Sequence, residues 1–403
     1  MPSLSRRASF WVAAAVVAIA LWTSAAPTVT YPLYASEWGL TPVVTTAIFA
    51  VYPLVLVVVL VVFGNLSDYI GRRRAILYGL AASLGGVLLF AVAPNVGWIF
   101  VGRVLMGIGV GLSMSPATAA MVEFSAAGRE KGASSITTAS TALGLALATL
   151  VGGVLIEYGP NPAHLNFWVL AVVVAGVMVI AWFLPRPTAT TEAAGRWRPR
   201  PLVVPRELRG SFAIAAAAVS GAFALGALFL SLGVQIAQAL IHSDNALANG
   251  AVISLNAVAI GASALLVRRW RSDLIVVGGG IATLLGIGLL LLSSVEHSLS
   301  LFVMAGIVTG VGYSSLFSGG LGLINATAPA HHRAGTVSSV YLVAYFLQGS
   351  IALILGASAT ASGLQVALET GIAIVAVLSV AAAVLAAAVG RPSALGPAQP
   401  PLH

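Results

Sequence analysis

The sequence has no cysteine and very few charged residues. Only 7% of its 403 residues are Asp, Glu, Lys or Arg, whereas 59% are hydrophobic. Soluble domains carry about a quarter charged residues, so a water-soluble globule of this size is excluded. Intrinsic disorder is excluded as well, because it requires low hydrophobicity. Without cysteine there is no disulfide framework, thiolate metal site or cysteine nucleophile. The class that remains is a protein that crosses a membrane many times.

Long apolar runs follow one another along the chain. A membrane helix needs about 20 mostly apolar residues, and about twelve such runs are present, six on each side of a Pro- and Arg-rich stretch. We therefore predict an all-α membrane protein of twelve transmembrane helices. It would comprise a six-helix bundle over 1–184, a cytoplasmic linker over 185–210, a second bundle over 211–390 and a tail over 391–403. The runs lie near 10–34, 42–63, 75–94, 97–121, 133–157, 164–184, 211–241, 249–267, 274–294, 299–324, 335–358 and 366–389. The first run is expected to be an uncleaved helix rather than a signal peptide.

The basic residues lie on one side of these predicted spans. If the N-terminus is cytoplasmic and the spans alternate, all but one of the 19 Lys and Arg residues fall in cytoplasmic segments. This bias follows the positive-inside rule. We therefore expect a multi-pass protein of the plasma membrane with both termini in the cytoplasm. The bias also explains the net charge of +8 without nucleic acid as a partner.

The two halves of the chain resemble each other. Gly107 and Gly109 in the fourth run correspond to Gly310 and Gly312 in the tenth. Each of the first two glycines lies 203 residues before its counterpart. Two similar halves that enclose a site near mid-membrane are an architecture found in transporters.

The loop after the second run carries the most specific motif. Residues 64–74 read GNLSDYIGRRR. This segment resembles the G-x-L-x-D-x-x-G-R-[RK] signature of the major facilitator superfamily, and residues 103–107 (RVLMG) resemble that family's R-x-x-x-G motif. Residues 27–32 resemble the end of helix 1 in drug-efflux members. The resemblance implies two pseudo-symmetric six-helix bundles, a small-molecule substrate and, for the drug-efflux type, exchange of drugs against protons. It also implies a monomer, with the proton gradient as energy source and no cofactor or metal.

The same resemblance implies a charge cluster that latches the two halves together on the cytoplasmic side. Two glycines permit close helix approach and a sharp turn. Asp68 and Arg72 are four residues apart, so they can pair if that stretch is helical. The predicted members of the latch are Gly64, Asp68, Gly71, Arg72, Arg73 and Glu123.

One feature of the fifth run leaves the direction of transport open. Residues 144–153 resemble the family's antiporter motif, but the Gly-Pro of that motif is absent and only the final pair Gly152-Gly153 is kept. An importer or facilitator of a small metabolite is therefore the alternative to an exporter. A membrane enzyme or scaffold is a third reading, but the spans contain no HExxH or GxSxG motif. An ATP-binding P-loop is excluded, because the single lysine lacks the required neighbours.

Arg103 is the only basic residue predicted at membrane depth. Such a charge is a functional candidate, because it is costly to bury. It could reach the central cavity or extend outward, hold an anionic substrate group or tune a carboxylate. No acidic residue lies in the middle third of a predicted span, so Glu37, Glu157 or the latch would carry any coupled proton. Neutral, amphipathic or anionic substrates are favoured over permanent cations.

Polar and aromatic side chains at helical spacing mark a candidate substrate cavity. Three share one face of the seventh run and three share one face of the eleventh. The predicted lining residues are Tyr31, Met106, Ser231, Gln235, Gln238, Asn256, Tyr313, Tyr341, Tyr345 and Gln348.

Overall fold

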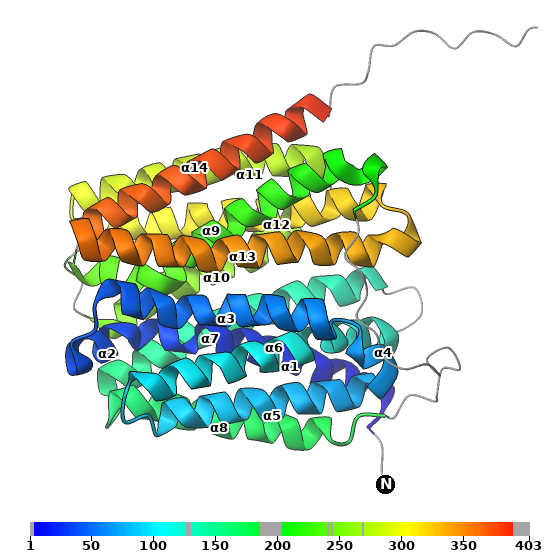
Figure 1. Ribbon diagram of the computed structural model, residues 1–403, viewed down its shortest axis with the longest axis horizontal. Helices are drawn as coiled ribbons and strands as arrows, with labels where there is room; N and C mark the ends of the chain where they lie inside the picture. Colours follow the sequence, from blue (N-terminus) through cyan, green and yellow to red (C-terminus); the bar gives the residue numbers. More distant parts are fainter. Residues whose placement is uncertain are drawn as a thin grey trace, which may run out of the picture.

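The computed structural model describes residues 4–125, 130–185, 204–239, 242, 245–267 and 270–389 as a bundle of long helices (Figure 1). Every regular element within these ranges is helical. Twelve stretches of this described part are long and apolar enough to cross a membrane. The predicted fold class and number of spans are thereby confirmed. Most of the predicted linker and all of the predicted tail lie outside the described residues.

The N-terminal half contains the first six spans. Its elements are α1 Arg6–Ala25, η1 Ala26–Val29, α2 Tyr31–Trp38, α3 Pro42–Phe63, α4 Leu66–Ile70, α5 Arg72–Ala91, α6 Val96–Phe124, α7 Glu130–Tyr158 and α8 Pro162–Ala181.

The C-terminal half contains the other six spans. Its elements are η2 Arg206–Leu208, α9 Arg209–Ala239, α10 Ala246–Val267, α11 Ser272–Val295, α12 Leu299–Thr327, α13 Ala330–Ser362 and α14 Leu364–Val389.

The first span is interrupted, whereas the sequence predicted one continuous run. A 3-10 turn, η1, separates α1 from α2. Pro27 lies in its first turn, and the backbone N–H of Thr30 bonds to the carbonyl of Pro27. Proline has no N–H to donate to the preceding turn, so it ends the α-helical hydrogen-bond ladder here. The break redirects the chain just before Tyr31.

The motif loop is also not one continuous helix. Gly71 has φ 86° and ψ 145°, so α4 ends there and α5 begins at Arg72. Glycine adopts this positive φ without the steric penalty of a side chain. The helical spacing that would pair Asp68 with Arg72 is therefore absent, which corrects the expectation from sequence.

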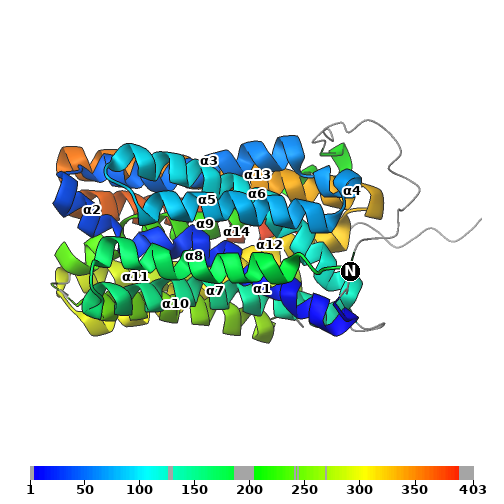
Figure 2. The ribbon, with the colours of Figure 1, turned by 90° about the horizontal axis from the view of Figure 1, so that it is seen from below.

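The two halves lie side by side with their helices roughly parallel (Figure 1). The helix pairs α3–α13 and α7–α10 make most of the contacts between them. We call the end of the bundle that carries the N-terminus and α4 the proximal end, and the end that carries α2 the distal end. Figure 2 shows these two ends from a perpendicular direction. Under the predicted orientation the proximal end is cytoplasmic.

The glycine repeat noted in the sequence has the same packing role in both halves. A Cβ added at Gly107 of α6 would lie 2.9 Å from a backbone oxygen of α3, and one at Gly310 of α12 would lie 2.6 Å from a backbone oxygen of α10. Gly109 and Gly312 similarly face α5 and α11. Small residues let membrane helices approach this closely. The repeat therefore corresponds to two equivalent three-helix contacts.

Candidate functional site

A cavity lies between the two halves of the bundle. Helices α1, α3 and α7 line it from the N-terminal half, and α9, α10, α12 and α13 line it from the C-terminal half. The lining is mostly apolar and aromatic with a few polar groups, as is usual for small-molecule sites. Its volume is about 90 Å³. Sites for drug-sized ligands measure roughly 300–1,000 Å³, so a ligand of that size requires the cavity walls to move apart.

The structure brings some of the predicted residues to this cavity and adds others. Asn256, Tyr313, Tyr345 and Gln348 line it, as the sequence predicted. Sequence reasoning missed the lining residues Ser24, Tyr52, Thr149, Phe223 and Phe229. Tyr52 could have been found, because it is a polar aromatic residue beside a proline inside an apolar span. Phe223 and Phe229 lie in an apolar run without any polar periodicity, so nothing in the sequence distinguishes them.

Aromatic rings form the wall on the C-terminal side. The ring centroid of Phe223 lies 4.6 Å from that of Tyr345 and 6.4 Å from that of Tyr313. Tyr341 stands behind them, with its ring 6.1 Å from Tyr345, and is not a lining residue. Flat rings at these separations offer a surface on which a planar apolar group can stack.

The two amide side chains of the cavity differ in their hydrogen bonding. The Nδ2 of Asn256 donates to the carbonyl of Gly306 at 2.7 Å and contacts the hydroxyl of Thr309 at 3.2 Å. Asn256 thus ties α10 to α12. Gln348 is almost fully buried and lines the cavity. Its side-chain amide has both donor and acceptor groups, which a ligand in the cavity could use.

Four more of the predicted cavity residues lie elsewhere. The hydroxyl of Ser231 donates to the backbone of its own helix at 2.6 Å. Gln235 donates to Thr45 of the other half at 3.2 Å, and Gln238 is half-buried on the last turn of α9. Met106 belongs to the hydrophobic core of the bundle. None of these four is among the residues that line the cavity.

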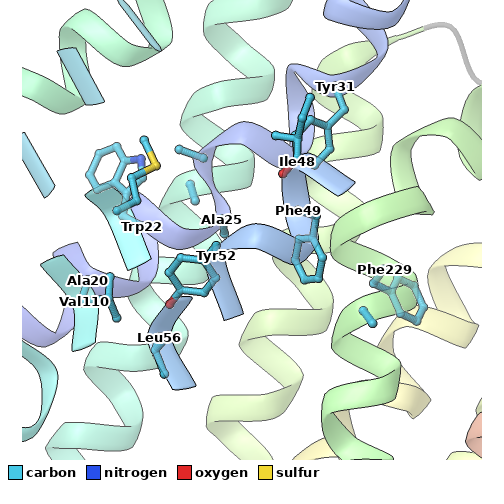
Figure 3. Close-up of a cluster of buried hydrophobic side chains, with 14 of the residues drawn as sticks. Ala20, Trp22, Ala25, Tyr31, Ile48, Phe49, Tyr52, Leu56, Val110 and Phe229 are labelled. Carbon is cyan, nitrogen blue, oxygen red and sulfur yellow. The ribbon is translucent and has the colours of Figure 1, made fainter. Parts of the chain in front are cut away.

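Arg103 of α6 is fully buried, so it does not extend outward to the membrane surface. Its Nη1 donates to the carbonyl of Ser24 at 2.8 Å, and its Nη2 donates to the hydroxyl of Tyr31. The guanidinium also lies 5.8 Å and 5.7 Å from the ring centroids of Tyr31 and Tyr52. Figure 3 shows these two tyrosines in a cluster of buried hydrophobic side chains that also includes Phe229 of α9.

The hydrogen bonds and ring contacts of Arg103 are with uncharged groups. All four contacts are neutral, and among the described residues no salt bridge to Arg103 is present. Its Nε is buried without a hydrogen-bond partner. Ser24 and Tyr52 line the cavity, so the guanidinium lies one layer of side chains behind the cavity wall.

The two candidate coupling acids lie at the distal end. Glu37 on α2 is exposed. Glu157 on the last turn of α7 is exposed too, and its Oε2 accepts a hydrogen bond of 2.8 Å from the backbone N–H of Ala246. Ala246 is the first residue of α10. Glu157 therefore joins the two halves at a helix N-terminus, where a negative charge is favourable.

Other contacts also join the halves at the distal end. The backbone N–H of Val43 donates to the hydroxyl of Thr360 at 2.9 Å, beside the bond between Gln235 and Thr45. A Cβ at Gly153 would lie 2.9 Å from the carbonyl oxygen of Ala246. The backbones of α7 and α10 are thus in close contact here. These contacts hold the two halves together at the distal end.

The predicted latch residues lie at the proximal end. Arg72 of α5 forms an ion pair with Glu123 of α6, and the Arg73 guanidinium lies 5.4 Å from the ring centroid of Trp182. Both contacts join elements of the N-terminal half. Gly64 ends α3, and Gly71 ends α4. Asp68 also has an interaction partner, within a loop whose shape is set by these two glycines.

Arg6 forms a proximal contact that the sequence did not predict. Its guanidinium donates to three backbone carbonyls at the end of α6, those of Glu123 at 3.1 Å, Phe124 at 3.3 Å and Ser125 at 2.6 Å. The last carbonyls of a helix have no partner within the helix, so a cation is favourable there. Arg6 thereby fixes the turn that carries Glu123.

Comparison with known proteins agrees with this architecture. The profile of the Major Facilitator Superfamily matches residues 10–353. The multidrug efflux pump LfrA of Mycolicibacterium smegmatis is 32% identical over 154 residues, which are 37% of this chain. That match spans only 30% of the length of the pump.

Solved transporter structures are similar over nearly the whole chain. A peptide transporter POT in complex with sulfate has a TM-score of 0.72 at 19% identity, covering 96% of this chain and 95% of that one. A bacterial homologue of the human lysosomal transporter Spinster, inward-facing and unoccupied, has a TM-score of 0.68 at 14% identity, with 95% and 97% covered. At these identities the likeness concerns the fold. The family match over residues 10–353 shows that the chain belongs to the Major Facilitator Superfamily, a family of membrane transporters.

Proposed function

We propose that this transporter exports small amphipathic molecules from the cell in exchange for protons. The cavity between the halves carries the proposal, because its aromatic walls suit apolar ligands and it is lined by both halves. The similarity to a multidrug efflux pump over 154 residues supports the direction and the substrate type.

Alternating access would proceed by rocking of the two halves around this cavity. The contacts of Glu157, Val43 and Gln235 close the distal end. With the proximal end in the cytoplasm, as the positive-inside bias favours, the cavity of this conformation would load from the cytoplasm. Breaking the distal contacts would then release the substrate outside. The latch residues Asp68, Arg72 and Glu123 would hold the proximal end closed in that second state.

Protons would be exchanged at the ends of the spans rather than at the cavity. Glu37 and Glu157, the candidate acids at the distal end, are exposed. They would therefore meet the external proton concentration directly. Glu157 is the better candidate for proton coupling, because its carboxylate also bridges the halves. Protonation would weaken that bridge by removing the negative charge that faces the helix N-terminus.

The test uses inside-out vesicles with an acid interior and a fluorescent dye that reports internal pH. Amphipathic antibiotics, dyes and small metabolites are added one at a time to vesicles that contain the wild type or the Asp68→Asn variant at matched expression. We expect one or more amphipathic compounds to dissipate the gradient in wild type only. If no compound changes the gradient while uptake of a labelled solute still depends on the protein, proton-coupled export is wrong, and the importer or facilitator takes its place.

A further inference from the structure

We propose that the preferred cargo is an aromatic weak acid, bound with its anionic group toward Arg103 and its ring toward the aromatic wall of the C-terminal half. This inference rests on the proposed function, because it takes the cavity between the halves as the substrate site. It goes further in assigning a charge and an orientation to the substrate.

The first step is the charge of the cavity. Arg103 is fully buried, and its partners are a carbonyl, a hydroxyl and two aromatic faces. Arginine stays protonated in proteins, so the charge persists. The described acids Glu37 and Glu157 are exposed at the distal end. Among the described residues no carboxylate pairs with this guanidinium, so a positive charge without an ion-pair partner lies close behind the cavity wall.

The second step is the range of that charge. In an apolar interior Coulomb interactions are several times stronger than in water, and mobile salt ions do not screen buried groups effectively. Ser24 and Tyr52 separate the guanidinium from the cavity by one side-chain layer. An anion in the cavity would be attracted through this layer, and a cation would be repelled. The unpartnered Nε adds one unused donor on the same group.

The third step is the opposite wall. Phe223, Tyr313 and Tyr345 contribute neighbouring rings from α9, α12 and α13. Among the described residues, those that line the cavity are all uncharged. A flat aryl group would stack there, while its acidic group points across the interface to α1 and α3. Such a ligand would touch both halves at once.

The experiment compares three ligands that share one ring system, 2-naphthoate, 2-naphthamide and 2-naphthylmethylammonium. Binding is measured by calorimetry on the full-length protein in nanodiscs of zwitterionic lipid, with empty nanodiscs subtracted. We expect the carboxylate to bind at least about tenfold more tightly than the ammonium, with the amide between them, since about 1.4 kcal/mol corresponds to a factor of ten. The order should persist in high salt, because the responsible charge is buried.

Two variants separate charge from packing. In Arg103→Met the three affinities should converge, and Arg103→Lys should retain the order of wild type. In Phe223→Leu all three ligands should weaken by a similar factor, because the ring wall is shared. Equal affinities in wild type, tighter binding of the ammonium, or no binding of any naphthyl ligand would overturn the inference. A preference that vanishes in high salt would also overturn it, since it would arise from the arginine-rich surface.

The outcome is distinct from that of the proposed function. Gradient-linked transport of neutral or cationic compounds without any preference for the carboxylate would leave export standing and remove this inference. Salt-resistant, Arg103-dependent binding of naphthoate without any gradient-linked transport would support this inference and contradict proton-coupled export.

Discussion

The carboxylate of Glu157 in the last turn of α7 accepts a hydrogen bond of 2.8 Å from the backbone N–H of Ala246, the first residue of α10. The two residues belong to different halves, so this bond must break whenever the halves separate at the distal end. An exposed, charge-assisted bond at a helix N-terminus is worth about 0.3–1 kcal/mol. It is therefore strong enough to bias an equilibrium and weak enough to open.

The first prediction concerns this bond. We expect Glu157→Ala to shift the protein about twofold to fivefold toward a distally open state, which follows from the loss of up to about 1 kcal/mol. The measurement is labelling of a single engineered thiol at Thr46→Cys, a buried position of α3 that faces Gly356 of α13; the absence of native cysteine gives a clean background. Glu157→Gln keeps an acceptor oxygen and serves as the control. Equal labelling of the three proteins would show that the bond does not hold the distal end closed.

A second prediction compares two buried tyrosines of α2. The hydroxyl of Tyr31 accepts from the charged Arg103, whereas that of Tyr34 donates to the carbonyl of Ala163 at 3.2 Å. Bonds to charged groups contribute about 1.5–3 kcal/mol, compared with about 1 kcal/mol for neutral ones. Tyr31→Phe should therefore reduce the free energy of unfolding in detergent more than Tyr34→Phe does. Equal losses would mean that Arg103 finds another partner.

The third prediction concerns the glycine repeat. Gly107→Ala and Gly310→Ala should each lower thermal stability, by about 1–3 kcal/mol, because the new methyl group meets a backbone oxygen of a neighbouring helix. Gly176→Ala on α8 is the matched control, since a Cβ there meets nothing within 4 Å. Alanine there should be neutral or stabilising by up to about 1 kcal/mol. If the control is destabilised as much as the others, close helix approach is not the cause.

The fourth prediction concerns the contact of Arg6 with the end of α6. Arg6→Ala should lower thermal stability by about 0.3–1 kcal/mol, because three helix-terminal carbonyls lose their cation. Its neighbour Arg7 is also exposed, so Arg7→Ala controls for the change in net charge. The same midpoint of unfolding for both variants would assign the effect to surface charge rather than to this contact.

Some features of the site were readable from the chain, but only where a single residue stood out from its surroundings. Asn256, Tyr313, Tyr345 and Gln348 are polar or aromatic residues in apolar spans, and they line the cavity. Ser231 has the same appearance in sequence, yet its hydroxyl bonds to its own helix. A serine can bond to the carbonyl four residues before it in any helix, so helical spacing alone does not separate the two cases.

The loop motif illustrates the same limit. Its sequence identified the family, but the spacing of Asp68 and Arg72 suggested a pairing that requires a continuous helix. Gly71 at φ 86° interrupts that helix, and Arg72 pairs with Glu123, 51 residues away in the chain. A turn formed by a single glycine changes the direction of every side chain after it.

The sequence by itself determined the class of protein and the number of spans, and it indicates their orientation. The bilayer imposes these locally, because each span needs about 20 apolar residues with its backbone bonds satisfied internally, and basic loops stay on one side. Only the tertiary structure decided that Arg103 lies behind Ser24 and Tyr52, that Glu157 meets α10, and that Phe223 faces the cavity. Lipid tails are as apolar as the side chains on the surface of a membrane helix. The composition of a span therefore does not encode which neighbouring helix it packs against. That choice depends on the fit of small residues between helices distant in the chain.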